Sequence, residues 1–130
     1  MERKRYVEVA MSIGALVVLS QAMLGAFSLK SKKEIWNRDG GQSAESGDQG
    51  NLECAHYDHS RENPLYNDPS NGRLLTRREH YLDHFYRRDN GLSQQANEWA
   101  VKMIWDRLSK SERKGLPAPD KYHQLALALD

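Results

Sequence analysis

His80 and His84 are the residues of this 130-residue chain whose type and spacing most directly suggest chemistry. They lie four positions apart, and on a helix that spacing puts both imidazoles on one face, with β-carbons about 5 to 6 Å apart. Two nitrogen ligands placed in this way can bind one divalent cation. Histidine pairs on a helix are more often solvated than metal-bound, so a metal site needs further ligands.

Asp58 and His59 supply a carboxylate and a third imidazole earlier in the chain. They end a stretch, residues 52–59, that has the composition of a β-strand, and neighbouring strand residues point to opposite faces. Both side chains can serve one site only if the backbone bends after the strand, which Pro64 and the polar loop around it favour. The carboxylate and two imidazoles would then hold the cation. His59 would act as a base, because an unperturbed imidazole titrates at about pH 6.5.

The order of these residues resembles the HNH, or ββα-metal, nuclease motif. Its polar positions are matched, in order and approximate spacing, by Asp58, His59, Asn71, His80 and His84. The segment KKEIWNRDGGQS, residues 32–43, also resembles the helix and turn that lead into this motif. The resemblance covers about residues 31–88.

The resemblance implies a role for each of these residues. His59 would be the general base that takes a proton from the attacking water, and Asn71 would hold the loop and the His59 ring by hydrogen bonds. Asp58 and His80 would be ligands of one divalent metal ion (Mg, Mn, Ni or Zn), with His84 a third ligand or a contact to the scissile phosphate. The cation would stabilise charge on the phosphate and on the leaving oxygen. The predicted function is therefore metal-dependent hydrolysis of DNA phosphodiester bonds by an HNH-type endonuclease.

The chain departs from the many family members that carry two CxxC pairs around a structural zinc. Ser43 and Ser46 stand in the places of the first pair, and Thr76 and Glu79 in those of the second. Cys54 is the only cysteine, so neither a CxxC pair nor a disulfide within the chain can form. No structural zinc is expected, and the folding free energy that zinc would supply must come from other packing.

The elements that must position the site are two short strands followed by a helix. Residues 52–59 and 72–76 have the composition of strands, separated by a loop rich in proline and asparagine. Thr76 and Glu79 form the pattern of a capping box, which predicts that a helix begins there, and Asp89–Gly91 predicts its end. The predicted fold class is α+β, a small ββα-metal (HNH) domain with flanking α-helices and an apolar amino-terminal helix.

Residues 91–130 are helical in pattern and predict an extension that packs on the nuclease core, residues 30–90. Apolar residues recur at spacings of three and four, which predicts one buried helix face; they are Ala96, Trp99, Ala100, Met103, Ile104 and Leu108. Trp99, Met103, Ile104 and Trp105 are expected to form the core that replaces the zinc. Residues 115–120 break the helix, and residues 121–130 are expected to form a final short one.

The net charge of +1 does not mark the chain as a nucleic-acid binder, but arginines gather locally around the motif. Arg73, Arg77 and Arg87 are the predicted phosphate contacts, and a solvated helix face is an equally good interpretation of the cluster. His56 is expected to be a packed or hydrogen-bonded strand residue.

Residues 1–29 form a hydrophobic amino-terminal segment. Residues 9–29 carry no charge, and 21 residues of helix would just cross a hydrocarbon core of about 30 Å. The basic residues at positions 3–5 suit a membrane anchor, and the small-residue site at Leu24–Ala26 suits a cleaved signal peptide. A buried helix of a soluble protein is the third interpretation. The expected location is therefore the membrane or outside the cell, with the cytoplasm as the alternative.

Two other functions compete with the endonuclease. A catalytically inactive nucleic-acid-binding module could retain the metal-binding residues without turnover, since a motif does not prove activity. A membrane-tethered interaction protein would instead use residues 9–29 as its functional element. Nicking assays with and without a chelator, and cell fractionation, separate these functions.

Overall fold

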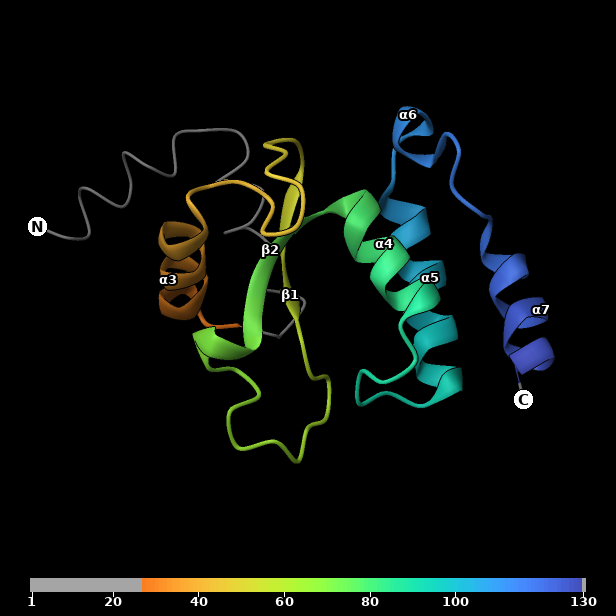
Figure 1. The fold of residues 1–130 in the computed structure, drawn as a ribbon, viewed down its shortest axis with the longest axis horizontal. Coiled ribbons are helices and arrows are strands. Elements are labelled where there is room, and N and C mark those ends of the chain that lie inside the picture. Colours follow the sequence, from red (N-terminus) through yellow and green to blue (C-terminus); the bar gives the residue numbers. More distant parts are fainter. Residues whose placement is uncertain (1–26, 130) are drawn as a thin grey trace, which may run out of the picture. The chain divides into compact units, whose positions relative to one another are not determined.

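The computed structural model describes residues 27–129, which form two compact units, residues 27–76 and 77–129 (Figure 1). The first unit contains α3 (Leu29–Asp39), β1 (Leu52–His56), the 3-10 helix η2 (Pro69–Asn71) and β2 (Gly72–Thr76). The second contains α4 (Arg77–Tyr86), α5 (Gln94–Arg107), α6 (Lys110–Arg113) and α7 (Pro119–Leu129). The fold class is α+β, with an antiparallel strand pair and several helices. The two units meet in the sequence at residue 76, and the domain boundary at residue 90 stays a prediction.

The two strands of the first unit form an antiparallel pair. Leu52 lies opposite Thr76, and His56 lies opposite Gly72. β2 has the predicted bounds, whereas β1 ends at His56 and not at residue 59. The chain leaves the strand there because the backbone at residue 58 bonds to the Asn71 side chain. The polar pair that follows β1 therefore lies in a loop, as the predicted bend requires.

Helix α3 packs against the strand pair and covers the helical part of residues 32–43, the segment that resembles a helix and turn. Its first N–H groups are capped by Ser28, whose hydroxyl accepts from Ser31 N, and Gly40 closes its end in the left-handed conformation, φ 73°. The core is formed by Phe27, Ile35, Leu52 and Leu74, with Trp36 and Cys54 packed against it. A Cβ at Gly72 would lie 2.6 Å from two of these side chains, so only glycine allows this packing.

The end of the hydrophobic amino-terminal segment belongs to the first unit. Phe27 is buried in its core, and Ser28 and Leu29 begin α3. The rest of the segment predicted as an anchor, signal peptide or buried helix, residues 9–26, lies outside the described residues. Between residues 27 and 129, no helix has the length and hydropathy needed to cross a bilayer.

The turn around Ser43 is stabilised by hydrogen bonds within the turn itself. The buried Ser43 hydroxyl accepts from the backbone N–H groups of Glu45 and Ser46, both at 3.1 Å. The Ser43 N–H donates to Asp48 O at 2.8 Å, and its carbonyl accepts from Gly47 N at 2.9 Å. A hydroxyl supplies these acceptor functions without a metal, because it has two lone pairs.

The second unit is built on α5, which packs against both α4 and α7 (Figure 1). Its buried core consists of Tyr81, Phe85, Val101, Ile104, Leu108 and Tyr122. The prediction that Trp99 belongs to the core was wrong, because this side chain is 65% exposed. The buried stripe of α5 is rotated toward Val101, so Trp99 lies outside it. Trp105 is half-buried and packs against the core, as predicted.

Candidate functional site

Asn71 holds the loop that follows β1. Its Oδ1 accepts from Asp58 N at 3.0 Å, and its Nδ2 donates to the carbonyls of Asp58 and Tyr66, both at 2.9 Å. The residue is buried at the end of η2, so water competes little for these bonds. The Asn71 amide thus connects both sides of the loop. Asn71 was expected to hold this loop and the His59 ring, and these bonds account for the first of the two.

Asp58 also shapes this loop. Its Oδ1 accepts from Ser60 N, and its Oδ2 accepts from Asn63 Nδ2, both at 2.9 Å. An ionised carboxylate offers about four lone-pair positions, so these two bonds leave capacity for a cation. The half-buried Asp58 can therefore be a structural residue, a metal ligand or both.

His56 lies in a stack of aromatic rings next to His59. Its ring is 4.1 Å from Phe27 and 4.2 Å from Tyr66 between centroids, with both pairs only 15° from parallel. Its Nε2 is 3.3 Å from Asn67 Oδ1. The His59 ring centroid lies 5.5 Å from that of His56. His56 is therefore a packed strand residue, as predicted, and it supports the half-buried His59.

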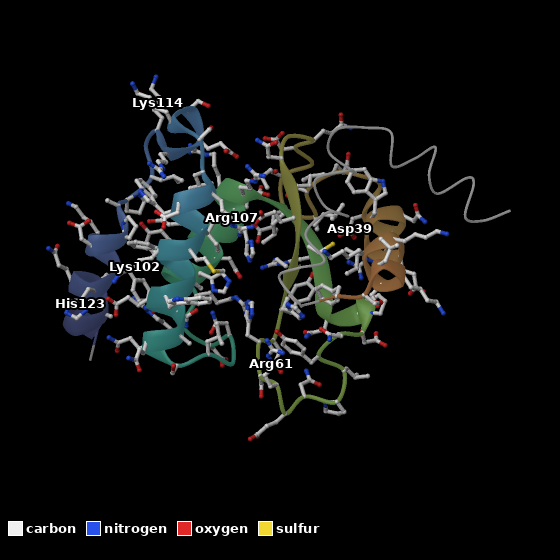
Figure 2. All side chains as sticks on the ribbon, turned by 180° about the vertical axis from the view of Figure 1, so that it is seen from behind. Asp39, Arg61, Lys102, Arg107, Lys114 and His123 are labelled. Atoms are coloured by element: carbon white, nitrogen blue, oxygen red, sulfur yellow. The ribbon has the colours of Figure 1, made fainter. Side chains whose placement is uncertain are left out.

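Arg61 is a cation that the sequence analysis did not select. It is exposed in the loop between β1 and η2, and its guanidinium lies 4.8 Å from the Tyr66 ring centroid (Figure 2). The contact continues the stack that contains His56 and Phe27. Its position two residues after His59 was the available signal, since a positive charge beside the predicted general base would suit a phosphate.

The three arginines predicted as phosphate contacts each lie close to an acid. The pairs are Arg73 with Glu45 at 2.9 Å, Arg77 with Glu112 at 3.8 Å, and Arg87 with Asp83 at 3.0 Å. Pairs with solvent access contribute only about 0 to 1 kcal/mol, so exchange of an acid for a phosphate costs little. Their role on nucleic acid remains a prediction, and their present partners are intramolecular.

His80 and His84 lie one turn apart on α4, as predicted. Their ring centroids are 5.0 Å apart, with an angle of 48° between the planes. His84 is buried, whereas His80 is half-buried. Burial, assisted by the charge of His80, lowers the pKa of His84 to about 4, and the hydrogen bond that His84 donates to Asn97 opposes this shift. His84 is therefore neutral at physiological pH, the state in which imidazole binds a metal.

Asn97 contacts His84 and Asn90 contacts Asn97, and neither contact was predicted from the sequence. Asn97 Oδ1 lies 3.2 Å from His84 Nδ1 and accepts from Asn90 Nδ2 at 2.8 Å. Asn97 occupies a position on the buried stripe of α5, among apolar residues. A polar residue at a core position was the signal that could have identified it, because buried amides require hydrogen-bond partners.

The predicted metal ligands are divided between the two units, with Asp58 in the first and His80 and His84 in the second. Within residues 27–129, no group of three or more histidine, cysteine, aspartate or glutamate side chains is arranged to hold a metal ion. In chemical type, one carboxylate with imidazoles suits a divalent transition metal, and magnesium if oxygen ligands from water are added.

The chain matches no protein-family model, no curated protein and no solved structure. A fold of two strands and several helices hosts many activities, so it does not choose among them.

Proposed function

We propose that the chain is a divalent-metal-dependent endonuclease that hydrolyses DNA phosphodiester bonds. The observation that carries the proposal is the Asn71 clamp, in which one buried amide makes three hydrogen bonds to the loop that bears Asp58 and His59. Buried amides with several backbone contacts fix a loop in one conformation. A fixed loop is what a general base needs, because proton transfer depends on its position.

The order of elements also supports this function. The loop with Asp58 and His59 follows β1, Asn71 immediately precedes β2, and α4 follows with His80 and His84 on one face. The polar residues thus lie in the loop after β1, at the end of η2 and on one side of α4. This is the ββα order that the resemblance to HNH nucleases implies.

In the proposed reaction, His59 accepts a proton from the attacking water. Asp58 and His80 hold the cation, and His84 is a third ligand or a phosphate contact. The bound cation supplies positive charge at the phosphate and at the leaving oxygen. Asn71 keeps the loop in the conformation that orients His59.

The test is nicking of supercoiled plasmid by the full chain with Mg²⁺, Mn²⁺, Ni²⁺ or Zn²⁺, and with EDTA. His59→Ala should abolish nicking with little change in metal affinity, because His59 is the base. His80→Ala should lower both, because His80 is a ligand. His123→Ala is the matched control, since His123 is exposed on α7 (Figure 2). His59→Ala protein, purified free of other nucleases, that cuts at the wild-type rate would contradict the role of His59.

A nucleic-acid-binding module without turnover is the second candidate. The bonds from Ser60 and Asn63 to both carboxylate oxygens of Asp58 favour it, because they give Asp58 a structural role without a cation. In this case DNA binding would persist in EDTA, and nicking would not appear with any of the four metals. Binding measured by fluorescence anisotropy beside the nicking assay separates the two functions.

A further inference from the structure

His84, Asn97 and Asn90 form a hydrogen-bonded chain inside the second unit. Their exposed fractions are 4%, 2% and 1%, so bulk water contributes little to their hydrogen bonding. Asn97 Oδ1 contacts His84 Nδ1 at 3.2 Å and Asn90 Nδ2 at 2.8 Å. Asn97 Nδ2 returns a bond to Asn90 Oδ1 at 3.2 Å, so the two amides pair reciprocally.

A backbone group fixes which way each amide points. The N–H of Leu92 can only donate, so the Asn90 atom at 3.1 Å from it must be the carbonyl oxygen. The other end of the Asn90 amide is then the NH₂ group, and the Asn97 atom that it faces must be an oxygen. The reciprocal bond, from Asn97 Nδ2 to Asn90 Oδ1, agrees with this assignment.

The orientation of Asn97 determines the tautomer of His84. An amide oxygen only accepts hydrogen bonds, so Nδ1 of a neutral His84 must carry the hydrogen that it donates. The lone pair of the ring is then on Nε2.

We propose that Asn97, oriented by Asn90, is a positioning residue that holds His84 in the Nδ1-protonated tautomer and so makes Nε2 a ligand for a divalent cation. Metal-binding histidines commonly donate their other N–H to an oxygen acceptor, which fixes the ring and raises the basicity of the ligand. His80 lies one turn away on the same face of α4 and supplies a second imidazole. The metal-binding part of this inference rests on the proposed function, whereas the tautomer does not.

The first experiment reads the tautomer directly in the full chain. Long-range ¹H–¹⁵N spectra at neutral pH should give His84 the pattern of an Nδ1-protonated ring. Addition of Zn²⁺, which is diamagnetic, should then shift the His84 Nε2 resonance more than the Nδ1 resonance. An Nε2-protonated ring, or a His84 unaffected by Zn²⁺, overturns the proposal.

The second experiment removes the acceptor. Asn97→Leu should weaken Zn²⁺ binding by about 10- to 100-fold in calorimetric titration, the range expected when the partner of a ligating histidine is lost. Asn97→Asp keeps an oxygen toward His84 and should recover most of the affinity, which a purely structural role does not predict. Gln95→Leu is the matched control, because Gln95 is exposed on the same helix.

The outcomes separate this inference from the proposed function. Unchanged Zn²⁺ affinity in folded Asn97→Leu protein overturns the inference, even if the wild-type chain nicks DNA. If Asn97→Leu protein does not fold, as judged by circular dichroism, the wild-type spectra and the Asn97→Asp titration decide. Absence of nicking in a protein that shows the expected tautomer and Zn²⁺ shift overturns the endonuclease and leaves the inference standing.

Discussion

Asn71→Ala should destabilise the first unit by about 3 kcal/mol. The substitution removes three side-chain hydrogen bonds, to Asp58 N, Asp58 O and Tyr66 O, and each such bond contributes about 1 kcal/mol net. Water that enters the loop would satisfy part of the exposed backbone and lower this value, whereas groups that stay buried would raise it. The loop that bears His59 should loosen with it, so nicking activity should fall even in protein that remains folded.

Asn71→Asp is the sharper version of this experiment. The side chain keeps its shape and its acceptor toward Asp58 N, but the donor to two carbonyls becomes a carboxylate oxygen. Oxygens that face one another repel, so the isosteric change should cost at least as much as Asn71→Ala. An argument from lost volume alone predicts the opposite order.

The assay is urea unfolding followed by tryptophan fluorescence. Trp36 reports on the first unit, because it packs against that unit's core. Asn67→Ala is the matched control, since the exposed Asn67 side chain makes a single long contact, 3.3 Å, to His56. Asn67→Ala should lower the free energy of unfolding by less than about 1 kcal/mol. If Asn71→Ala unfolds within about 0.5 kcal/mol of the wild-type chain, the clamp has no energetic basis.

Three further predictions test the site and the core. The pKa of His84 is about 4 in the folded chain and about 6.5 in the unfolded chain. In EDTA, the free energy of unfolding should therefore be highest above pH 6.5 and should fall by about 3 kcal/mol as the pH is lowered to 4. His84→Gln should remove this pH dependence, measured by urea unfolding at several pH values. Arg61→Gln should reduce the salt dependence of DNA binding by about one phosphate contact in anisotropy titrations, while Lys121→Gln, also at an exposed position, should not. Trp99→Ser should change thermal stability by less than about 0.5 kcal/mol, whereas Ile104→Ala should cost about 2 to 5 kcal/mol; equal effects would contradict the observed burial.

Features with a local cause were predictable from the sequence. β2 occupies Gly72–Thr76 because a short apolar run lies between turn residues on one side and a helix start on the other. His80 and His84 share a face because one helical turn separates them. Asn71 holds the loop after β1, and the resemblance to HNH nucleases was the reason for expecting it.

Features that depend on distant partners were not predictable. Helix α3 has a largely polar sequence, and its length depends on packing of Ile35 against Phe27 and the strands. The rotation of α5 that exposes Trp99 is set by α4 and α7, because both pack on it. The contact from Asn97 to His84 joins two helices across a loop, so no spacing rule predicts it.

The self-contained turn at Ser43 has a practical consequence for any chelation experiment. Its hydroxyl and backbone groups are bonded to Glu45, Ser46, Gly47 and Asp48, so removal of divalent ions takes away none of the contacts that close it. If the chain is the proposed endonuclease, EDTA should stop cleavage without opening this turn, and buffer exchange with a divalent metal should restore cleavage. If circular dichroism shows that the chain stays folded in EDTA, loss of nicking in chelator can be attributed to loss of the bound cation.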